Sequence, residues 1–107
     1  MIKQGNIVLV PFPFTDLSSS KVRLALILSS GFVGEDVVVA FISSQQKKGK
    51  YNVSIAPSEE NGLKADSVVV CNKVATLEKA IIIGELGLLE ESILRNMKAK
   101  LEELFNL

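Results

Sequence analysis

Arg23 is the side chain of this sequence best suited to chemistry, because it is the one arginine in an apolar run, residues 22–30. A polar loop that contains Thr15 and Asp16 separates this run from an earlier one, residues 6–12. A fixed guanidinium can donate a pair of hydrogen bonds to phosphate oxygens. A cation at a strand end beside a loop therefore predicts a phosphate-facing site, and an ordinary surface arginine is the alternative.

A second candidate is Ser43, which ends a later apolar run and is followed by Ser44 and Gln45. A hydroxyl at a strand end can bind a phosphate oxygen. From the residue type alone, a serine that ends a strand by hydrogen bonding to its own backbone is the favoured interpretation. Lys47 and Lys48 then form a basic loop that could follow a nucleic-acid backbone or meet an acidic partner, although a solvated charge run is commoner.

The composition removes several kinds of catalysis. The sequence has no histidine, which excludes Ser-His-Asp hydrolysis, Cys-His nucleophilic catalysis and a paired-histidine ribonuclease site. Cys71 is the only cysteine, so we expect no intrachain disulfide and no zinc site. We also expect no cofactor. The 12 basic and 12 acidic residues cancel, so the net charge does not by itself favour nucleic-acid binding.

The length of 107 residues predicts a single domain, residues 1–107. No apolar run reaches the roughly 18 residues that a membrane-spanning helix needs. The first residues also lack the long apolar segment of a signal peptide. We therefore expect a cytoplasmic protein that does not enter a membrane.

The elements that must position these side chains are short strands. Apolar runs separated by turn residues predict six strands, at residues 6–12, 22–30, 36–42, 51–56, 67–74 and 80–86. Residues 76–79 could form one helical turn, and residues 90–104 carry the apolar stripe of a long helix. This order favours a mainly β protein, an antiparallel barrel or strongly bent sheet with the helix packed on it.

Five segments, in this order and at these intervals, make the sequence similar to one known family. The first two are Gly5-Asn6-Ile7-Val8, where the family pattern is G-D-I-V, and Arg23-Leu24-Ala25-Leu26, where it is R-P-A-L. The third is Ile42-Ser43-Ser44-Gln45, where the pattern is I-T-S-Q, and the fourth is Asp66-Ser67-Val68-Val69-Val70-Cys71-Asn72, where it is D-S-V-V-x-C-D. The fifth is Thr76-Leu77-Glu78-Lys79, where the pattern is T-x-x-K, and Ile83-Gly84 follows it as I-G. On these residues the chain resembles the MazF/PemK/Kid family, the toxins of type II toxin–antitoxin systems. No single segment is specific, whereas the ordered set is.

The resemblance implies a fold and an activity. The fold would be an SH3-like small β-barrel of the CcdB/Kid/MazF type with a C-terminal α-helix, forming a homodimer. The activity would be that of an mRNA interferase, a metal-independent endoribonuclease that cleaves single-stranded RNA at short sequences. The cognate antitoxin would be a separate protein whose acidic tail covers the RNA groove.

The resemblance also implies roles for individual residues. Arg23 takes the position of the family's catalytic arginine. Ser43 takes that of the threonine in I-T-S, where a hydroxyl would hold the scissile phosphate. The other positions that it implies in RNA binding are Phe14, Thr15 and Asp16 in the loop that gates the groove, the segment Ser44, Gln45, Lys47 and Lys48, and Asn72. Phe14 could stack on a base, and it is nearly as well explained as a core side chain.

Several departures from the family pattern bear on catalysis. Leu24 replaces a proline, Asn72 an acidic residue and Ala75 an arginine, and Asn6 stands in place of an early aspartate. An asparagine cannot accept a proton as a general base near neutral pH, so Asp16 or water would have to serve. These departures predict an altered activity or RNA specificity, or a weakened or inactive member.

Two other functions stay open at this stage. CcdB proteins share the barrel and the dimer but bind gyrase through the end of the terminal helix, where this chain has Leu104-Phe105-Asn106-Leu107. Packing of these side chains in the core is the simpler explanation for them. A catalytically silent module that binds an antitoxin or RNA is the other alternative. The motifs of the first strand and Arg23 favour the ribonuclease.

Overall fold

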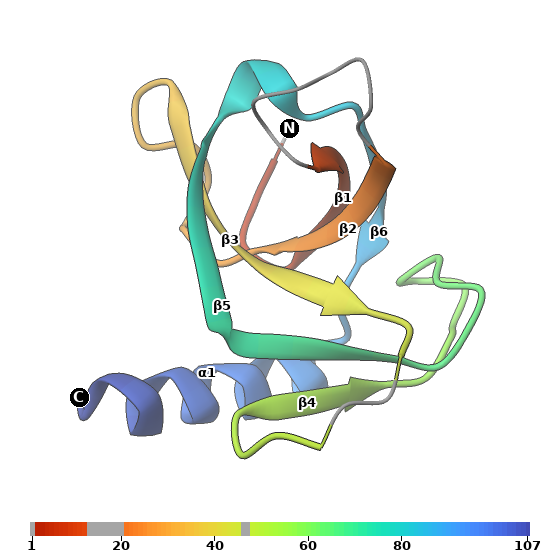
Figure 1. The fold of residues 1–107 in the computed structure, drawn as a ribbon, viewed down its shortest axis with the longest axis vertical. Coiled ribbons are helices and arrows are strands. Elements are labelled where there is room, and N and C mark those ends of the chain that lie inside the picture. Colours follow the sequence, from red (N-terminus) through yellow and green to blue (C-terminus); the bar gives the residue numbers. More distant parts are fainter. Residues whose placement is uncertain (1, 13–20, 46–47) are drawn as a thin grey trace.

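The computed structural model describes residues 2–12, 21–45 and 48–107. The predicted mainly β architecture with a C-terminal helix is confirmed (Figure 1). In chain order the elements are β1 (Asn6–Phe12), β2 (Lys21–Ile27), β3 (Asp36–Ser43), β4 (Asn52–Ile55), β5 (Ser67–Glu78), the 3₁₀ turn η1 (Lys79–Ile81), β6 (Gly84–Leu88) and α1 (Glu91–Phe105). Within the described ranges, no helix is long and apolar enough to cross a membrane.

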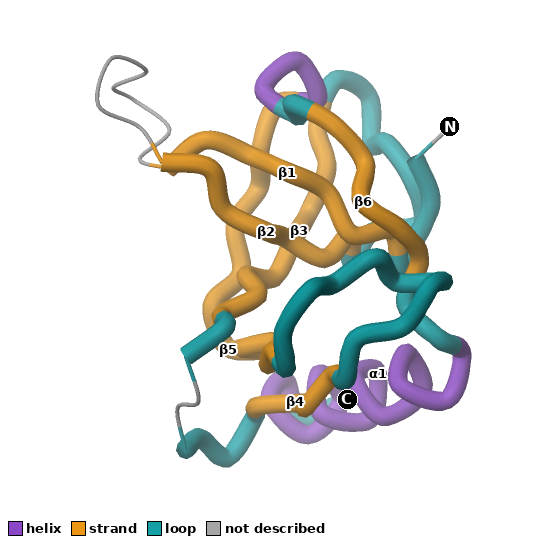
Figure 2. The backbone as a smooth tube through the Cα atoms, turned by 90° about the vertical axis from the view of Figure 1, so that its right-hand side faces the viewer, coloured by secondary structure: helices purple, strands orange, loops and turns teal. Residues whose placement is uncertain are grey.

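All strands join one antiparallel sheet in the order β4-β5-β3-β2-β1-β6. The sheet curls strongly into a half-barrel, which Figures 1 and 2 show from two sides. β1 lies between β2 and β6, and its pairing with β6 runs from Asn6↔Leu88 to Leu9↔Gly84. α1 packs against β4 and β5, on the outside of the curl (Figure 1).

Alternating side chains of the central strands build two hydrophobic clusters, one on each face of the sheet. The helix-side cluster includes Ile7 and Leu26, and Met97 of α1 packs into it. The inner cluster, on the opposite face, includes Val8 and Ala25 together with residues of η1. Because neighbouring residues enter different clusters, both faces of these strands are buried, which explains their nearly continuous apolar runs.

β5 bends sharply in its middle (Figure 1). Its pairing with β3 joins Phe41 to Val70 but the preceding residue Ala40 to Val74, so residues 71–73 have no partner on β3. An irregularity of this kind leaves residues unpaired and turns the strand. The first of the unpaired residues is fully buried in the helix-side cluster, and the other two are exposed.

The helix α1 presents an apolar stripe to the sheet. Met97 is fully buried, Ile93 packs against the same cluster, and Leu104 is half-buried at the end of the stripe. Phe105 and Leu107 are 56% and 88% exposed, so core packing is the wrong explanation for these two residues. The reason is helical geometry, since Phe105 lies about 100° around the helix from the stripe residue before it.

A buried asparagine attaches the connection between β4 and β5 to the start of α1. Asn61 is fully buried, and its amide nitrogen donates to the backbone oxygen of Ala56 at 2.9 Å and to the carboxylate of Glu90 at 3.0 Å. Its amide oxygen accepts from the backbone N–H groups of Ser58 at 3.0 Å and Leu63 at 2.9 Å. This one side chain therefore satisfies polar groups of a loop that would otherwise be buried unpaired.

Two local predictions are wrong. Where a helical turn is expected at residues 76–79, the chain is strand as far as Glu78, because β5 continues and buries Leu77 in the inner cluster. The sixth strand, expected at residues 80–86, begins only at Gly84, because residues 79–81 form η1. In both places tertiary pairing with β3 and β1 decides the conformation, which local sequence does not record.

Candidate functional site

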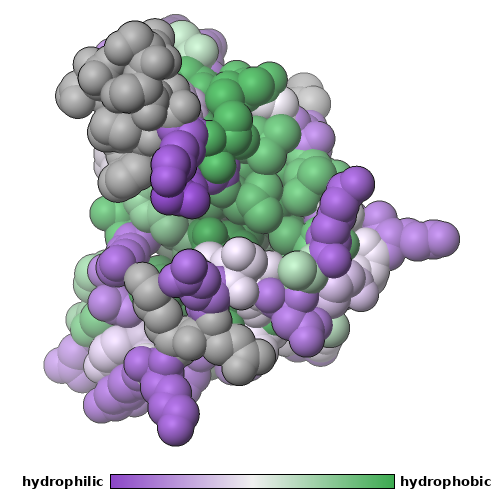
Figure 3. Space-filling view, turned by 45° about the vertical axis from the view of Figure 1, so that its right-hand side comes forward, coloured by the Kyte–Doolittle hydropathy of each residue, from purple (hydrophilic) through white to green (hydrophobic). Residues whose placement is uncertain are grey.

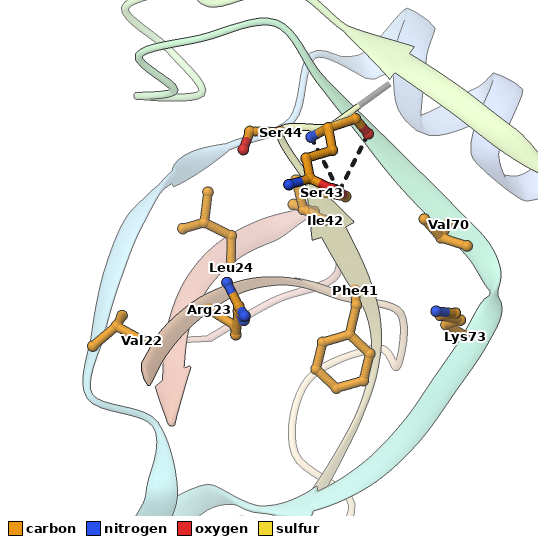
Figure 4. Close-up of a pocket in the computed structure, with 10 residues that line it drawn as sticks. Val22, Arg23, Leu24, Phe41, Ile42, Ser43, Ser44, Val70 and Lys73 are labelled. Atoms are coloured by element: carbon orange, nitrogen blue, oxygen red, sulfur yellow. Dashed lines mark hydrogen bonds between the residues drawn. The ribbon is translucent and has the colours of Figure 1, made fainter. Parts of the chain in front are cut away.

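A pocket of about 530 Å³ lies where β2 and β3 separate. The two strands are paired only as far as Leu24↔Ile42, after which β2 continues beside β1 and β3 beside β5. Apolar side chains of Val22, Leu24, Phe41, Ile42 and Val70 line this pocket together with the polar side chains of Arg23, Ser43, Ser44, Gln45 and Lys73 (Figure 4). The structure therefore brings together four of the residues that the sequence selected.

Arg23 enters the pocket from β2, where it pairs with Val10 of β1. Its neighbours Leu24 and Ala25 pack into opposite clusters, so alternation places Arg23 on the inner face together with Ala25. The guanidinium is exposed, and within the described part of the chain it makes no hydrogen bond or ion pair. The described residues therefore leave its side-chain donors available to an anion from solution.

Ser43 ends β3 on the same face as Arg23. Its hydroxyl donates to the backbone oxygen of Gln45 at 3.3 Å and accepts from the backbone N–H of that residue at 3.2 Å (Figure 4). This local pair is the arrangement that the residue type alone favours. It fixes a tight turn, which holds the exposed side chains of Ser44 and Gln45 at the pocket.

The pocket carries positive charge without a compensating carboxylate. Arg23 and Lys73 both line it, and among the described residues no acidic side chain does so. Sequence reasoning missed Lys73. The signal that could have found it is the pair of polar residues, Asn72 and Lys73, that follows the apolar run of residues 68–71. A concave site with apolar walls and two cations suits a ligand that combines a flat apolar part with anionic groups.

The other predicted RNA-binding residues are not brought into this pocket. Asn72 and Lys48 are exposed, and neither is among the residues that line it. Asn72 is the neighbour of Lys73 in the bend of β5, which places it near the pocket edge. Phe14, Thr15, Asp16 and Lys47 lie outside the described residues.

The departures from the family pattern have structural explanations at three positions. Leu24 lines the pocket and packs against the helix-side cluster, whereas Ala75 packs against the inner cluster and is not among the residues that line the pocket. Asn6 is buried, and its amide nitrogen donates to Glu85 Oε1 at 2.6 Å while its oxygen accepts from the backbone N–H of Lys3 at 2.8 Å. An aspartate could not make the first of these bonds when ionised.

Cys71 is fully buried, and this burial raises the pKa of its thiol, an effect that the nearby charge of Lys100 partly opposes. The side chain therefore stays a protonated thiol at neutral pH and is not an activated nucleophile. In residues 2–12, 21–45 and 48–107, no group of three or more His, Cys, Asp or Glu side chains could hold a metal ion.

An apolar surface extends over the face that carries β1, β2 and β6 (Figure 3). Val22 of β2 is 57% exposed and Ile83, just before β6, is 58% exposed. The backbone N–H of Ile83 donates to the oxygen of Leu9 at 2.8 Å, which attaches this segment to β1. Exposed apolar surface of this kind is typical of a face that meets another protein.

Comparison with known proteins agrees with this fold along nearly the whole chain. Residues 3–105 match the family model of the PemK-like, MazF-like toxin of type II toxin-antitoxin system. An endoribonuclease in complex with its cognate antitoxin from a mycobacterial species has a TM-score of 0.80 and 19% identity, over 100% of this chain and 97% of that chain. The Mycobacterium tuberculosis toxin MazF-mt6 has a TM-score of 0.76 and 25% identity, over 95% of this chain and 97% of that chain.

The Deinococcus radiodurans MazE-MazF crystal structure is similar as well, with a TM-score of 0.80 and 21% identity, over 99% of this chain and 97% of that chain. The gyrase-binding alternative receives no support from these matches. The strand order, the terminal helix and the family match agree with one another, and the chain belongs to the family of PemK-like, MazF-like toxins of type II toxin–antitoxin systems.

Proposed function

We propose that this protein is an endoribonuclease that cleaves single-stranded RNA, including mRNA, with the scissile phosphate held between β2 and β3. The observation that carries the proposal is the pocket itself, in which Arg23 and Ser43 share one face beside walls that contain no described acidic side chain. Membership of the toxin family and the endoribonuclease activity named for the similar mycobacterial structures support the same reaction.

Besides the RNA, the reaction needs a proton acceptor and a proton donor. The 2′-hydroxyl oxygen attacks the adjacent phosphorus and gives up its proton to the acceptor. The bond from phosphorus to the 5′ oxygen breaks, and that oxygen takes up a proton from the donor. The products are a 2′,3′-cyclic phosphate and a 5′-hydroxyl. We assign the proton acceptor to Asp16 or to water, because the amide of Asn72 is not basic.

Arg23 acts on the charge that builds up during this attack. Its guanidinium, which no described residue pairs with, donates hydrogen bonds to the phosphorane oxygens in this proposal or protonates the leaving oxygen. Donors aimed at developing charge contribute about 10²–10³-fold in rate each. Ser43 holds the phosphate through its hydroxyl, which exchanges its bonds to the Gln45 backbone for bonds to the substrate.

Further contacts to the RNA come from the surroundings of the pocket. Ser44 and Gln45 line it and are placed to reach phosphate or base edges, while Lys48 and Asn72 act from its margin. The loop that contains Phe14, Thr15 and Asp16, and the basic residue Lys47, serve the same RNA in this proposal.

We also propose that the protein works as a homodimer in the cytoplasm and is held inactive by a cognate antitoxin. The exposed apolar face around Val22 and Ile83 supports an association with a second protein chain. Similar structures in which toxin and antitoxin are bound together support the antitoxin as a partner.

The decisive experiment incubates the purified protein with a long single-stranded RNA in EDTA, alongside Arg23→Ala and Arg23→Lys. We expect cuts at a limited set of sites with the parent and a loss of about 10²–10³-fold with Arg23→Ala. Because Arg23 is exposed, the variants should unfold at the parent's temperature. Equal cleavage by the parent and a folded Arg23→Ala would refute this site.

A further inference from the structure

Lys73 is a second cation of the pocket, on the opposite wall from Arg23. Arg23 enters from β2 and Lys73 from β5, and in the view of Figure 4 the ring of Phe41 lies between them. No feature of the sequence motifs assigns a role to Lys73. Its position therefore needs an explanation of its own.

The bend of β5 is what brings Lys73 to the pocket. Residues 71–73 have no partner on β3, and the chain buries Cys71 in the helix-side cluster at the start of this segment. The backbone N–H of Cys71 also donates to the oxygen of Tyr51 at 3.2 Å, which fixes the bend from the side of β4. If β5 paired regularly with β3, residues 71–73 would not be left unpaired. This irregularity in the pairing therefore turns the side chain of Lys73 toward the pocket.

No acidic side chain of the described residues neutralises the charge of Lys73. In the described residues it forms no ion pair, whereas Lys50 lies 3.7 Å from Glu103 and Lys79 lies 3.4 Å from Glu35. A ligand phosphate would therefore not have to displace a carboxylate from Lys73. Its exposure also leaves the ammonium within reach of a ligand in the pocket.

We propose that Lys73 binds the phosphate next to the scissile one, so that the RNA is held across two adjacent phosphates, one at Arg23 and one at Lys73. This inference rests on the ribonuclease function proposed above and adds to it a residue that positions the substrate. A lysine is a point charge on a flexible stem, which suits binding of a neighbouring phosphate better than catalysis on the reacting one. Arg23 and Lys73 thus have separable effects.

The test measures binding of a short single-stranded DNA of mixed sequence, which lacks the 2′-hydroxyl and is not cleaved. Affinities are measured against salt concentration for the parent, Lys73→Gln, Lys73→Arg and Lys64→Gln. The last is a matched control, because Lys64 is exposed and outside the pocket, so both glutamine variants lose one charge. We expect Lys73→Gln to reduce the slope of log K against log salt by about 0.7, the value for one phosphate of a single strand.

Lys73→Arg should keep the parental slope, and Lys64→Gln should leave it unchanged. With RNA as substrate at low salt, Lys73→Gln should raise KM about fivefold, the effect of one exposed charge pair, while kcat stays within about twofold. Arg23→Ala should instead lower kcat. This split separates a lysine that positions substrate from a lysine that only supports the fold.

The outcomes distinguish this inference from the proposed function. An unchanged slope in Lys73→Gln, or an equal decrease in Lys64→Gln, overturns the role of Lys73 even if the parent cleaves RNA. A reduced slope in Lys73→Gln alone supports the phosphate contact. If the parent then fails to cleave any RNA, the contact stands and the ribonuclease assignment falls.

Discussion

Arg23 and Ser43 occupy facing positions of neighbouring strands, one step beyond the last pair that joins β2 to β3. That last pair is Leu24↔Ile42, and continuing the antiparallel register places Arg23 opposite Ser43. A slip of one residue in either strand would put Arg23 and Ser43 on opposite faces of the sheet. The burial of Leu24 and Ile42 toward the helix-side cluster therefore fixes where the cation and the hydroxyl lie.

The hydroxyl of Ser43 should matter more for activity than for stability. Ser43→Ala removes the hydrogen bonds to the Gln45 backbone, which are exposed, so we expect a loss of about 0.5–1 kcal/mol in unfolding free energy. Ser43→Thr keeps the hydroxyl and restricts its rotamers, so it should cleave RNA at least as fast as the parent. Initial cleavage rates and urea unfolding measure the two effects. A Ser43→Ala protein as active as the parent would remove Ser43 from the site.

The buried amide of Asn6 should not tolerate the family's aspartate. Asn6→Asp would place a carboxylate where the amide now donates to Glu85 Oε1 at 2.6 Å, and we expect a loss of about 1–3 kcal/mol at neutral pH. The new carboxyl would hold its proton more tightly in the folded state than in the unfolded state. Its stability should therefore fall as pH rises above the ordinary carboxyl range and recover on acidification.

Urea unfolding of Asn6→Asp at several pH values checks this prediction, with Asn6→Asp/Glu85→Gln as the control. The glutamine side chain restores an amide donor opposite the carboxylate, so the double variant should regain most of the lost stability. If the single variant is as stable as the parent at every pH, the Asn6–Glu85 bond does not contribute to the fold.

Cys71 should resist modification until the protein unfolds. Burial raises the pKa of its thiol, so little thiolate forms and the sulfur is also shielded from reagent. We expect slow reaction with a thiol reagent at mildly alkaline pH and fast reaction in urea. Because the unfolded thiol ionises at lower pH than the folded one, stability should also decline as pH rises through the unfolded pKa. Fast labelling of the native protein would contradict the buried position.

The side chain of Asn61 should be among the most sensitive positions outside the pocket. Asn61→Ala removes bonds to Ala56, Glu90, Ser58 and Leu63 at a fully buried site, and we expect a loss of about 2–4 kcal/mol. Asn96→Ala, at an exposed position of α1, is the control and should change stability by about 0.5 kcal/mol or less. Similar losses for the two variants would mean that the buried network is not specific.

Much of this fold could be predicted from the sequence, because each strand is an apolar run bounded by turn residues. Leu77 shows the limit of reasoning from local sequence. The residues around it predict a helical turn, but pairing with Val37 of β3 keeps the chain extended. The pocket followed from the positions of Arg23 and Ser43 at strand ends. Lys73 did not, because the bend that turns it outward depends on the packing of Cys71 and not on local sequence.

The position of β1 between β2 and β6 constrains the order in which the protein can assemble during its synthesis. Asn6 begins the first described strand, but its partner Leu88 ends the last one, so Leu88 is made after the other described strands. Pairing between strands so far apart in the sequence forms slowly, because the chain loses loop-closure entropy before the contacts between the strands can stabilise it. One edge of β1 therefore stays exposed until β6 has been made, and the sheet is completed late in folding.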